Sequence, residues 1–149
     1  MLSRLMSAFR AAEPAPLPEP DADLALGALL VQVAKSDHDY QYEEISRIDR
    51  ILARMCSIGP IEAAKMRATC EKLLAATADF HVFADLIRND LDFEARMTAL
   101  EALWQVVMAD GTQQEDELRL IEDLQRELGL TDVDSATARA NAMRRIGST

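Results

Sequence analysis

Two pairs of acidic residues are the part of this sequence whose types and spacing could do chemistry. Asp37 is followed seven residues later by Glu44, and Asp110 is followed seven residues later by Glu117. Carboxylate oxygens are the ligands that Ca²⁺ and Mg²⁺ prefer, and carboxylates that lie close together repel one another unless a cation lies between them. The spacing therefore favours a divalent-cation site, with Asp37, Glu44, Asp110 and Glu117 as its candidate metal ligands.

The two pairs belong to a longer internal repeat. Residues 30–51 align with residues 103–124 at a constant offset of 73 and without a gap. Shared apolar positions need mean only that two helices pack alike, but no hydrophobic core requires Asp and Glu at the same spacing twice. If the two copies face each other, the four carboxylates converge. The identical pairs are Leu30/Leu103, Gln32/Gln105, Val33/Val106, Asp37/Asp110, Gln41/Gln114, Glu44/Glu117 and Ile48/Ile121.

Helix capping is the competing interpretation of these acids. Acidic residues in the first turn of a helix are favoured by the helix dipole, and Thr112 with Glu115 has the spacing of a capping box. We expect Asp39 and Thr112 to be N-caps, and capping then accounts for Glu43 and Asp116 without any ion. It accounts less well for the repeated Asp-to-Glu spacing, because a cap does not require a Glu seven residues after an Asp. Both interpretations stay open.

The sequence lacks the patterns of several common metal sites and of catalytic sites. In a loop starting at Asp37, Tyr42 and Ile48 stand where an EF-hand needs its Gly and its bidentate Glu, and the second copy also fails at its twelfth position. Neither histidine follows a Glu by three residues, as di-iron bundles require, and two His with two Cys make a zinc site improbable. With no G-x-S-x-G, phosphate-binding glycine loop or H-E-x-x-H, we expect a protein that is not an enzyme.

The elements that must position these acids are helices. Apolar residues recur at helical spacing throughout the chain after residue 22, and no segment alternates as a strand would, so the sequence predicts an all-α fold. We expect a compact domain of about seven helices, in which two related helical hairpins carry the repeat. The predicted helices cover about 23–35, 41–57, 60–76, a shorter stretch capped by Asp79, a stretch capped by Asp92, 113–128 before Gly129, and a last helix from Thr131 or Asp132.

The first 22 residues differ from the rest. Residues 2–10 place Leu2, Leu5, Met6 and Phe9 on one face of a short amphipathic helix, which would anchor the chain to a membrane or partner or would fold back onto the domain. Every second residue from Pro14 to Pro20 is a proline, which is typical of an extended linker. We therefore divide the chain into an N-terminal segment, residues 1–22, and one helical domain, residues 23–149.

Charge restricts the partners. The net charge is −10, and residues 100–134 hold ten acids against two arginines. Such a surface repels phosphate backbones, so we expect no nucleic-acid binding; a cation or a basic protein patch fits better, and a solvated face that only keeps the protein soluble is the simpler alternative. No apolar run approaches the ~20 residues that span a bilayer. We expect Cys56 and Cys70 to be reduced thiols, and with no secretory signal we expect a cytoplasmic protein.

The residues around the second acidic loop resemble a known family. Ala109-Asp110-Gly111 closes one apolar helix and acids including Glu117 open the next, which is similar to the TerB-like family, the tellurite resistance protein TerB and its relatives. The first copy matches at Asp37 and Glu44 but has His38 in place of the glycine. The resemblance covers about residues 24–146. It implies a cytoplasmic all-helical domain in two related halves, an association with tellurite resistance and stress responses, a metal-binding acidic site, and work in complexes near the membrane.

Two hypotheses of function follow. The first is a non-enzymatic TerB-like module whose acidic loops bind a divalent cation, Ca²⁺ or Mg²⁺. The second is a protein-interaction module without metal, in which the acidic face or the amphipathic N-terminus docks a basic or membrane-associated partner.

Overall fold

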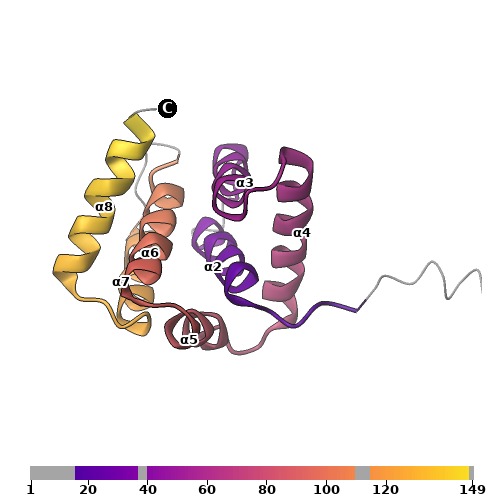
Figure 1. Ribbon diagram of the computed structural model, residues 1–149, viewed down its shortest axis with the longest axis horizontal. Coiled ribbons are helices and arrows are strands. Elements are labelled where there is room, and N and C mark those ends of the chain that lie inside the picture. Colours follow the sequence, from indigo (N-terminus) through magenta and orange to yellow (C-terminus); the bar gives the residue numbers. More distant parts are fainter. Residues whose placement is uncertain (1–15, 37–39, 110–114, 148–149) are drawn as a thin grey trace, which may run out of the picture.

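The computed structural model describes residues 16–36, 40–109 and 115–147, and these residues form seven helices and no strand, so the predicted all-α fold is confirmed. None of the described helices is long and apolar enough to cross a membrane. Figure 1 shows their arrangement. The helices are α2 (Ala22–Lys35), α3 (Tyr42–Cys56), α4 (Pro60–Ala76), α5 (His81–Asp90), α6 (Phe93–Val107), α7 (Glu115–Glu127) and α8 (Asp132–Gly147).

Local signals in the sequence set several helix ends as predicted. Asp92 caps α6, because its side chain accepts a hydrogen bond from the backbone N–H of Ala95 at 2.9 Å. Pro60 is the first residue of α4, where its missing N–H costs nothing. Gly129 follows α7 with φ of 74°, a left-handed conformation that favours glycine.

Two helix starts differ from the prediction. The N-cap of α3 is Gln41 rather than Asp39, so the helix begins two residues later than that cap would require. The shorter helix α5 begins at His81 and excludes Phe80, although Asp79 does stabilise its start by accepting a bond from the His81 N–H at 3.1 Å. Both differences are within the few residues by which helix ends commonly vary.

Helices α2 and α6 form the centre of the domain. α2 packs against α3, α4, α5, α6 and α7, and α6 packs against α2, α3, α7 and α8. Both helices are apolar on nearly every side, which is the pattern of a helix enclosed by others rather than one with a solvent face. The largest fully buried side chains include Leu29 and Leu30 of α2 and Leu100 and Leu103 of α6.

The repeat extends further than the aligned hairpins. Shifting α4 by the same 73 residues places it on α8, so each half holds three helices, α2–α3–α4 and α6–α7–α8, with α5 between them. The contacts are reciprocal: α4 packs on α2 as α8 packs on α6, and α3 packs on α6 as α7 packs on α2. This crosswise pairing is what a pseudo-twofold axis between α2 and α6 produces, and it confirms the two related halves.

Gly27 permits the close packing of α4 on α2. A Cβ atom added at Gly27 would clash with the Sγ atom of Cys70, a fully buried residue of α4. The two cysteines are free thiols, Cys70 buried and Cys56 half-buried, and burial raises the pKa of the Cys70 thiol to about 12. A buried, protonated thiol packs as a small apolar group.

We predict that Gly27→Ala lowers the free energy of unfolding by roughly 1–3 kcal/mol, because the added methyl group overpacks the contact between α2 and α4. Urea denaturation followed by circular dichroism measures the effect. The same substitution should cost clearly less in a Cys70→Ala background, where the clashing sulfur is gone. An equal cost in both backgrounds would show that the contact with Cys70 is not the reason for the glycine.

Candidate functional site

Two of the four predicted ligands hold equivalent places in the two halves. Glu44 is the third residue of α3 and Glu117 is the third residue of α7. Each belongs to the helix that follows an acidic loop, and each residue is only 1% exposed. The predicted partners Asp37 and Asp110 lie outside the described residues, so their role as ligands stays a prediction.

The burial of the two glutamates follows from their register. Glu44 stands four and seven residues before Ile48 and Ile51, so it opens the buried stripe of α3. Glu117 stands in the same relation to Ile121 and Leu124 of α7. Each half therefore carries a carboxylate at a position that the helical pattern assigns to the core.

The neighbouring acids behave differently. Glu43 and Asp116 are exposed, and the side chain of Glu115 is 84% exposed and pairs with Arg119 one turn later at 2.8 Å. These are the acids that capping and the helix dipole explain, as predicted. Burial separates Glu44 and Glu117 from them, because a buried carboxylate is costly unless it is paired, hydrogen-bonded or bound to a cation.

Helix capping explains one hydrogen bond of Glu44, the glutamate of the first half. Gln41 and Glu44 form a capping box, in which the Gln41 N–H donates to Oε1 of Glu44 at 3.3 Å. Gln114, the counterpart of Gln41, lies outside the described residues. A capping box satisfies backbone groups at a helix end and does not require the side chain to face the core. Cap and cation ligand are therefore compatible roles for Glu44.

The repeated glutamines are not among the predicted site residues, and the structure gives them more weight. Gln105 is 2% exposed, and its Nε2 has no hydrogen-bond partner among the described residues; the same holds for the buried Oε1 of Gln32. Each precedes its repeated Asp by five residues. The sequence could have marked these glutamines as candidate site residues, because both copies of the repeat carry one at the same position. Buried amides without partners cost stability, so a structural or functional reason for them is expected.

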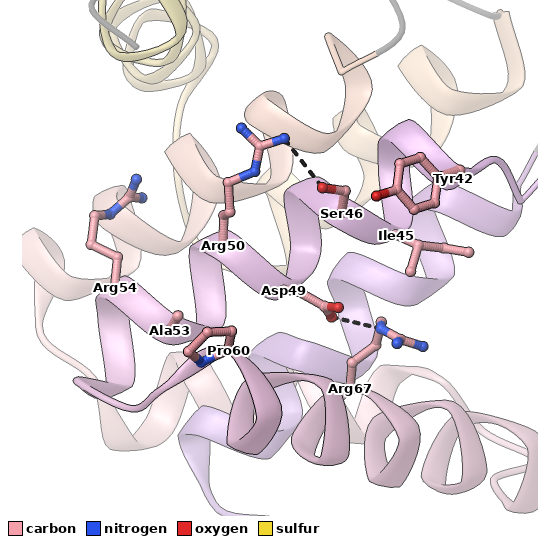
Figure 2. A pocket seen from close by; sticks show the side chains of 9 residues that line it. All are labelled: Tyr42, Ile45, Ser46, Asp49, Arg50, Ala53, Arg54, Pro60 and Arg67. Carbon is pink, nitrogen blue, oxygen red and sulfur yellow. Dashed lines mark hydrogen bonds and ion pairs between the residues drawn. The ribbon is translucent and has the colours of Figure 1, made fainter.

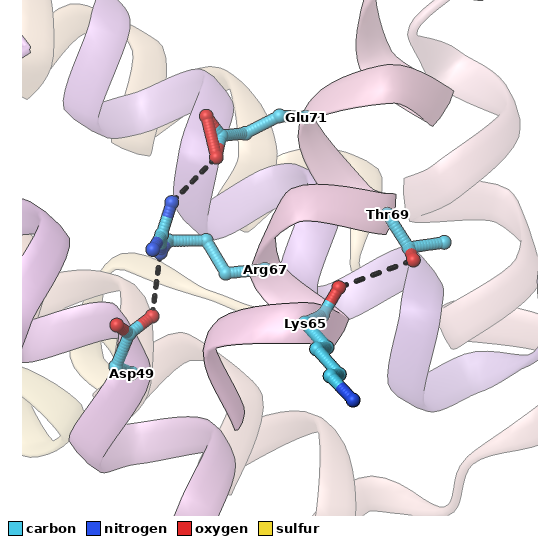
Figure 3. Close-up of polar contacts among 5 residues, drawn as sticks. All are labelled: Asp49, Lys65, Arg67, Thr69 and Glu71. Atoms are coloured by element: carbon cyan, nitrogen blue, oxygen red, sulfur yellow. Dashed lines mark hydrogen bonds and ion pairs between the residues drawn. The ribbon is translucent and has the colours of Figure 1, made fainter. Parts of the chain in front are cut away.

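A separate polar cluster ties α3 to α4 in the first half. The Arg67 guanidinium contacts Oδ1 of Asp49 through Nε and Oε1 of Glu71 through Nη1, both at 2.6 Å, as Figure 3 shows. All three side chains are about three-quarters buried or more. Burial, reinforced by the charge of Glu71, raises the pKa of the nearby Tyr40 to about 12, so this phenol stays neutral at physiological pH. The cluster is a structural clamp between two helices.

A surface groove of about 700 Å³ runs beside this clamp, between α3 and α4. Figure 2 shows Arg50 and Arg54 along the α3 side, Tyr42 at one end, and the Asp49–Arg67 pair within it. Among the described residues that line it, no Ser, Cys or His lies beside a base that could activate a nucleophile; Ser46 only accepts a bond from Arg50 at 3.2 Å. These lining residues form no arrangement that suggests catalysis.

Within the described part of the chain, no three His, Cys, Asp or Glu side chains come together so that they could hold a metal ion. Of the predicted site, this part contains only Glu44 and Glu117. The described geometry thus supplies one buried carboxylate per half, and any cation site would be completed by the two loops whose Asp residues are predicted ligands.

Fold and repeat together define a duplicated all-helical domain with one buried glutamate at the start of the second helix in each half. Residues 23–140 match the sequence profile of the family described as tellurite resistance protein TerB. The chain belongs to the TerB family, and the predicted resemblance is confirmed. None of the curated proteins and none of the solved structures compared with the chain matches it.

We predict that Glu117→Leu lowers the free energy of unfolding by about 1–3 kcal/mol, because the buried carboxylate takes part in a polar interaction whose other member would lose its partner. Urea denaturation in a buffer with a chelator measures the change. Glu115→Leu, on the exposed side of the same first turn, is the matched control and should change the stability little. A gain of stability in Glu117→Leu would show that the carboxylate contributes nothing to the fold.

Proposed function

We propose that this TerB-family protein is a non-enzymatic, cytoplasmic module that binds one divalent cation, Ca²⁺ or Mg²⁺, between its two acidic loops. Its role would lie in tellurite resistance and related stress responses, as the family description suggests. The observation that supports the proposal is the core-facing burial of Glu44 and Glu117 at the same position of the two halves. Asp37 and Asp110 are the further ligands.

The physical argument concerns the cost of two buried charges. Burying a carboxylate costs free energy of folding. Each half of this chain nevertheless buries one, at a position where the helical pattern favours an apolar residue. A divalent cation bound by oxygen ligands offsets that cost and removes the repulsion between the acids. Hard cations fit the ligand set, because all four proposed ligands are carboxylates.

Cation binding should raise the thermal stability of the full chain. At an ion concentration a hundred times Kd the gain is about 2.7 kcal/mol, so the melting temperature should rise by several degrees in Ca²⁺ or Mg²⁺ after treatment with a chelator. Glu44→Gln, Glu117→Gln and Asp110→Ala should each abolish or greatly reduce this rise. Glu115→Gln, which changes an exposed acid of the same helix turn, should keep it.

Isothermal titration calorimetry with Ca²⁺, Mg²⁺ and Mn²⁺ gives the stoichiometry, which we expect to be one ion per chain. An unchanged melting temperature at millimolar ion would overturn the proposal. A rise that persists undiminished in both Glu117→Gln and Asp110→Ala would overturn it as well, because the ion would then bind elsewhere.

An interaction role is the second candidate, and the exposed acids of α7 favour it. Glu115, Asp116, Glu122 and Asp123 all face solvent on one helix. Such a surface attracts a basic or membrane-associated partner, and the attraction falls as salt rises. A pull-down with the full chain should lose its partner after Glu115→Lys and Asp116→Lys or at high salt. Partner binding that changes neither with the two substitutions nor with salt would exclude this role.

A further inference from the structure

The two halves differ at one interface. In the first half α4 packs against both α2 and α3, whereas in the second half α8 packs on α6 without a comparable contact to α7. Each half has a groove here, and the groove between α7 and α8, of about 610 Å³, reaches down to Trp104 of α6. The corresponding groove of the first half is not lined by any residue of α2.

Larger residues on α6 line the second half of the repeat beneath α8. Leu100 and Trp104 stand where α2 has Gly27 and Val31, 73 residues earlier. The Trp104 ring fills the space beneath α8: its Nε1 donates to Oγ of Ser135 at 3.1 Å, and the Arg139 guanidinium lies 5.0 Å from the ring centroid.

The groove lacks the basic clamp that crosses its counterpart. Arg67, which joins α4 to Asp49 of α3 (Figure 3), is replaced in α8 by Ala140, while the acid persists as Glu122. The two arginines of α7 are engaged elsewhere, Arg119 with Glu115 and Arg126 with Asp123. Glu122 therefore has no ion-pair partner among the described residues, although its counterpart Asp49 has one.

The chemistry of the groove selects its occupant. Leu118 and Met143, which is 58% exposed, offer apolar surface above the buried Trp104. Glu122 and Asp132 supply two negative charges against the one positive charge of Arg139, which lies over the Trp104 ring. A fitting segment carries large apolar side chains on one face and an arginine in the place that Arg67 takes in the first half.

The chain itself contains such a segment. Residues 2–10 hold Leu2, Leu5, Met6 and Phe9 at helical spacing, with Arg4 and Arg10 and no acid. In a chain of net charge −10, this stretch is the complement of the acidic half. Charge and apolar pattern both match the groove.

The segment begins far from the groove of its own chain. Residues 16–20 run past α4, at the opposite end of the longest axis from α8 (Figure 1). Three helix contacts, α4 to α2, α2 to α6 and α6 to α8, lie between them. The five residues 11–15 span at most about 17 Å. This separation favours an occupant from another molecule.

We propose that the groove between α7 and α8 binds residues 2–10 of a second copy of the chain, so that the protein self-associates by exchange of its N-terminal segment. In this proposal the apolar side chains of the segment contact Leu118 and Met143, above Trp104, and one of its arginines pairs with Glu122. This interaction is independent of the cation site.

Trp104 is the single tryptophan of the chain, so its fluorescence reports directly on the groove. The full chain should associate with rising concentration in sedimentation equilibrium, and the emission of Trp104 should change in parallel. Leu5→Asp with Phe9→Asp should weaken association by roughly tenfold or more, as should Met143→Asp. Ile61→Asp is the matched control, because Ile61 is a 74% exposed apolar residue on α4, far from the groove.

A synthetic peptide of residues 1–12 supplies the second measurement. Added to the Leu5→Asp/Phe9→Asp chain, it should change Trp104 emission saturably, and Glu122→Arg should weaken its binding by roughly tenfold. Glu122 is exposed, so this variant keeps the fold, and a peptide with Arg4→Glu and Arg10→Glu should bind Glu122→Arg better than the native peptide does. Asp110→Ala should leave every one of these results unchanged, which separates this interaction from the cation site.

The proposal would be overturned if the chain stays monomeric and the emission of Trp104 does not change when the peptide is added. Association that survives both Met143→Asp and Leu5→Asp/Phe9→Asp would also overturn it, because the contact would then lie elsewhere.

Discussion

The packing of α2 against α6 is the contact on which the rest of the structure depends. Each of these helices is apolar on nearly all sides, so neither can exist with a face in water, and each is enclosed by helices from both halves. Because α3 rests on α6 and α7 rests on α2, neither half can complete its core alone. The duplication therefore makes one cooperative domain rather than two linked ones, and it also holds Glu44 and Glu117 in matching positions at the edge of the same core.

Small changes between the copies then decide what the surface can do. A glycine at position 27 permits close packing of α4 on α2, and the Arg67 clamp ties α4 to α3. Leucine and tryptophan stand at the corresponding places of α6, and Ala140 offers no clamp between α8 and α7. The fold tolerates this because α6 and α8 still bury their contact through Trp104 and Ser135. The two halves therefore share an architecture but differ in how their second and third helices are joined.

The fold could be predicted from the sequence because its signals are local. Helical spacing, the Asp92 cap and the Gly59-Pro60 stop each act within a few residues, and the repeat adds the relation between halves. The site could be predicted only in part. The sequence shows that Glu44 and Glu117 are repeated acids. Their burial depends on which face of α3 and α7 meets α2 and α6. The groove at Trp104 was not predicted, because the distance between α7 and α8 is a property of tertiary packing; in the sequence Trp104 is only one more residue of an apolar stripe.

Capping and cation binding can be separated by asking which atom each one needs. A capping box works with Glu or with Gln at its third helical position, since either side chain offers an oxygen to the N-cap backbone N–H. The bond from Gln41 to Oε1 of Glu44 would survive replacement by the neutral amide. What a glutamine would remove is the charge, and the charge is the part that burial makes costly. Both halves nevertheless carry glutamate there, 1% exposed and in line with the buried residues of its helix. The cap explains the oxygen but does not require the charge, and the cation that we propose is one physical reason for two such charges to face one core.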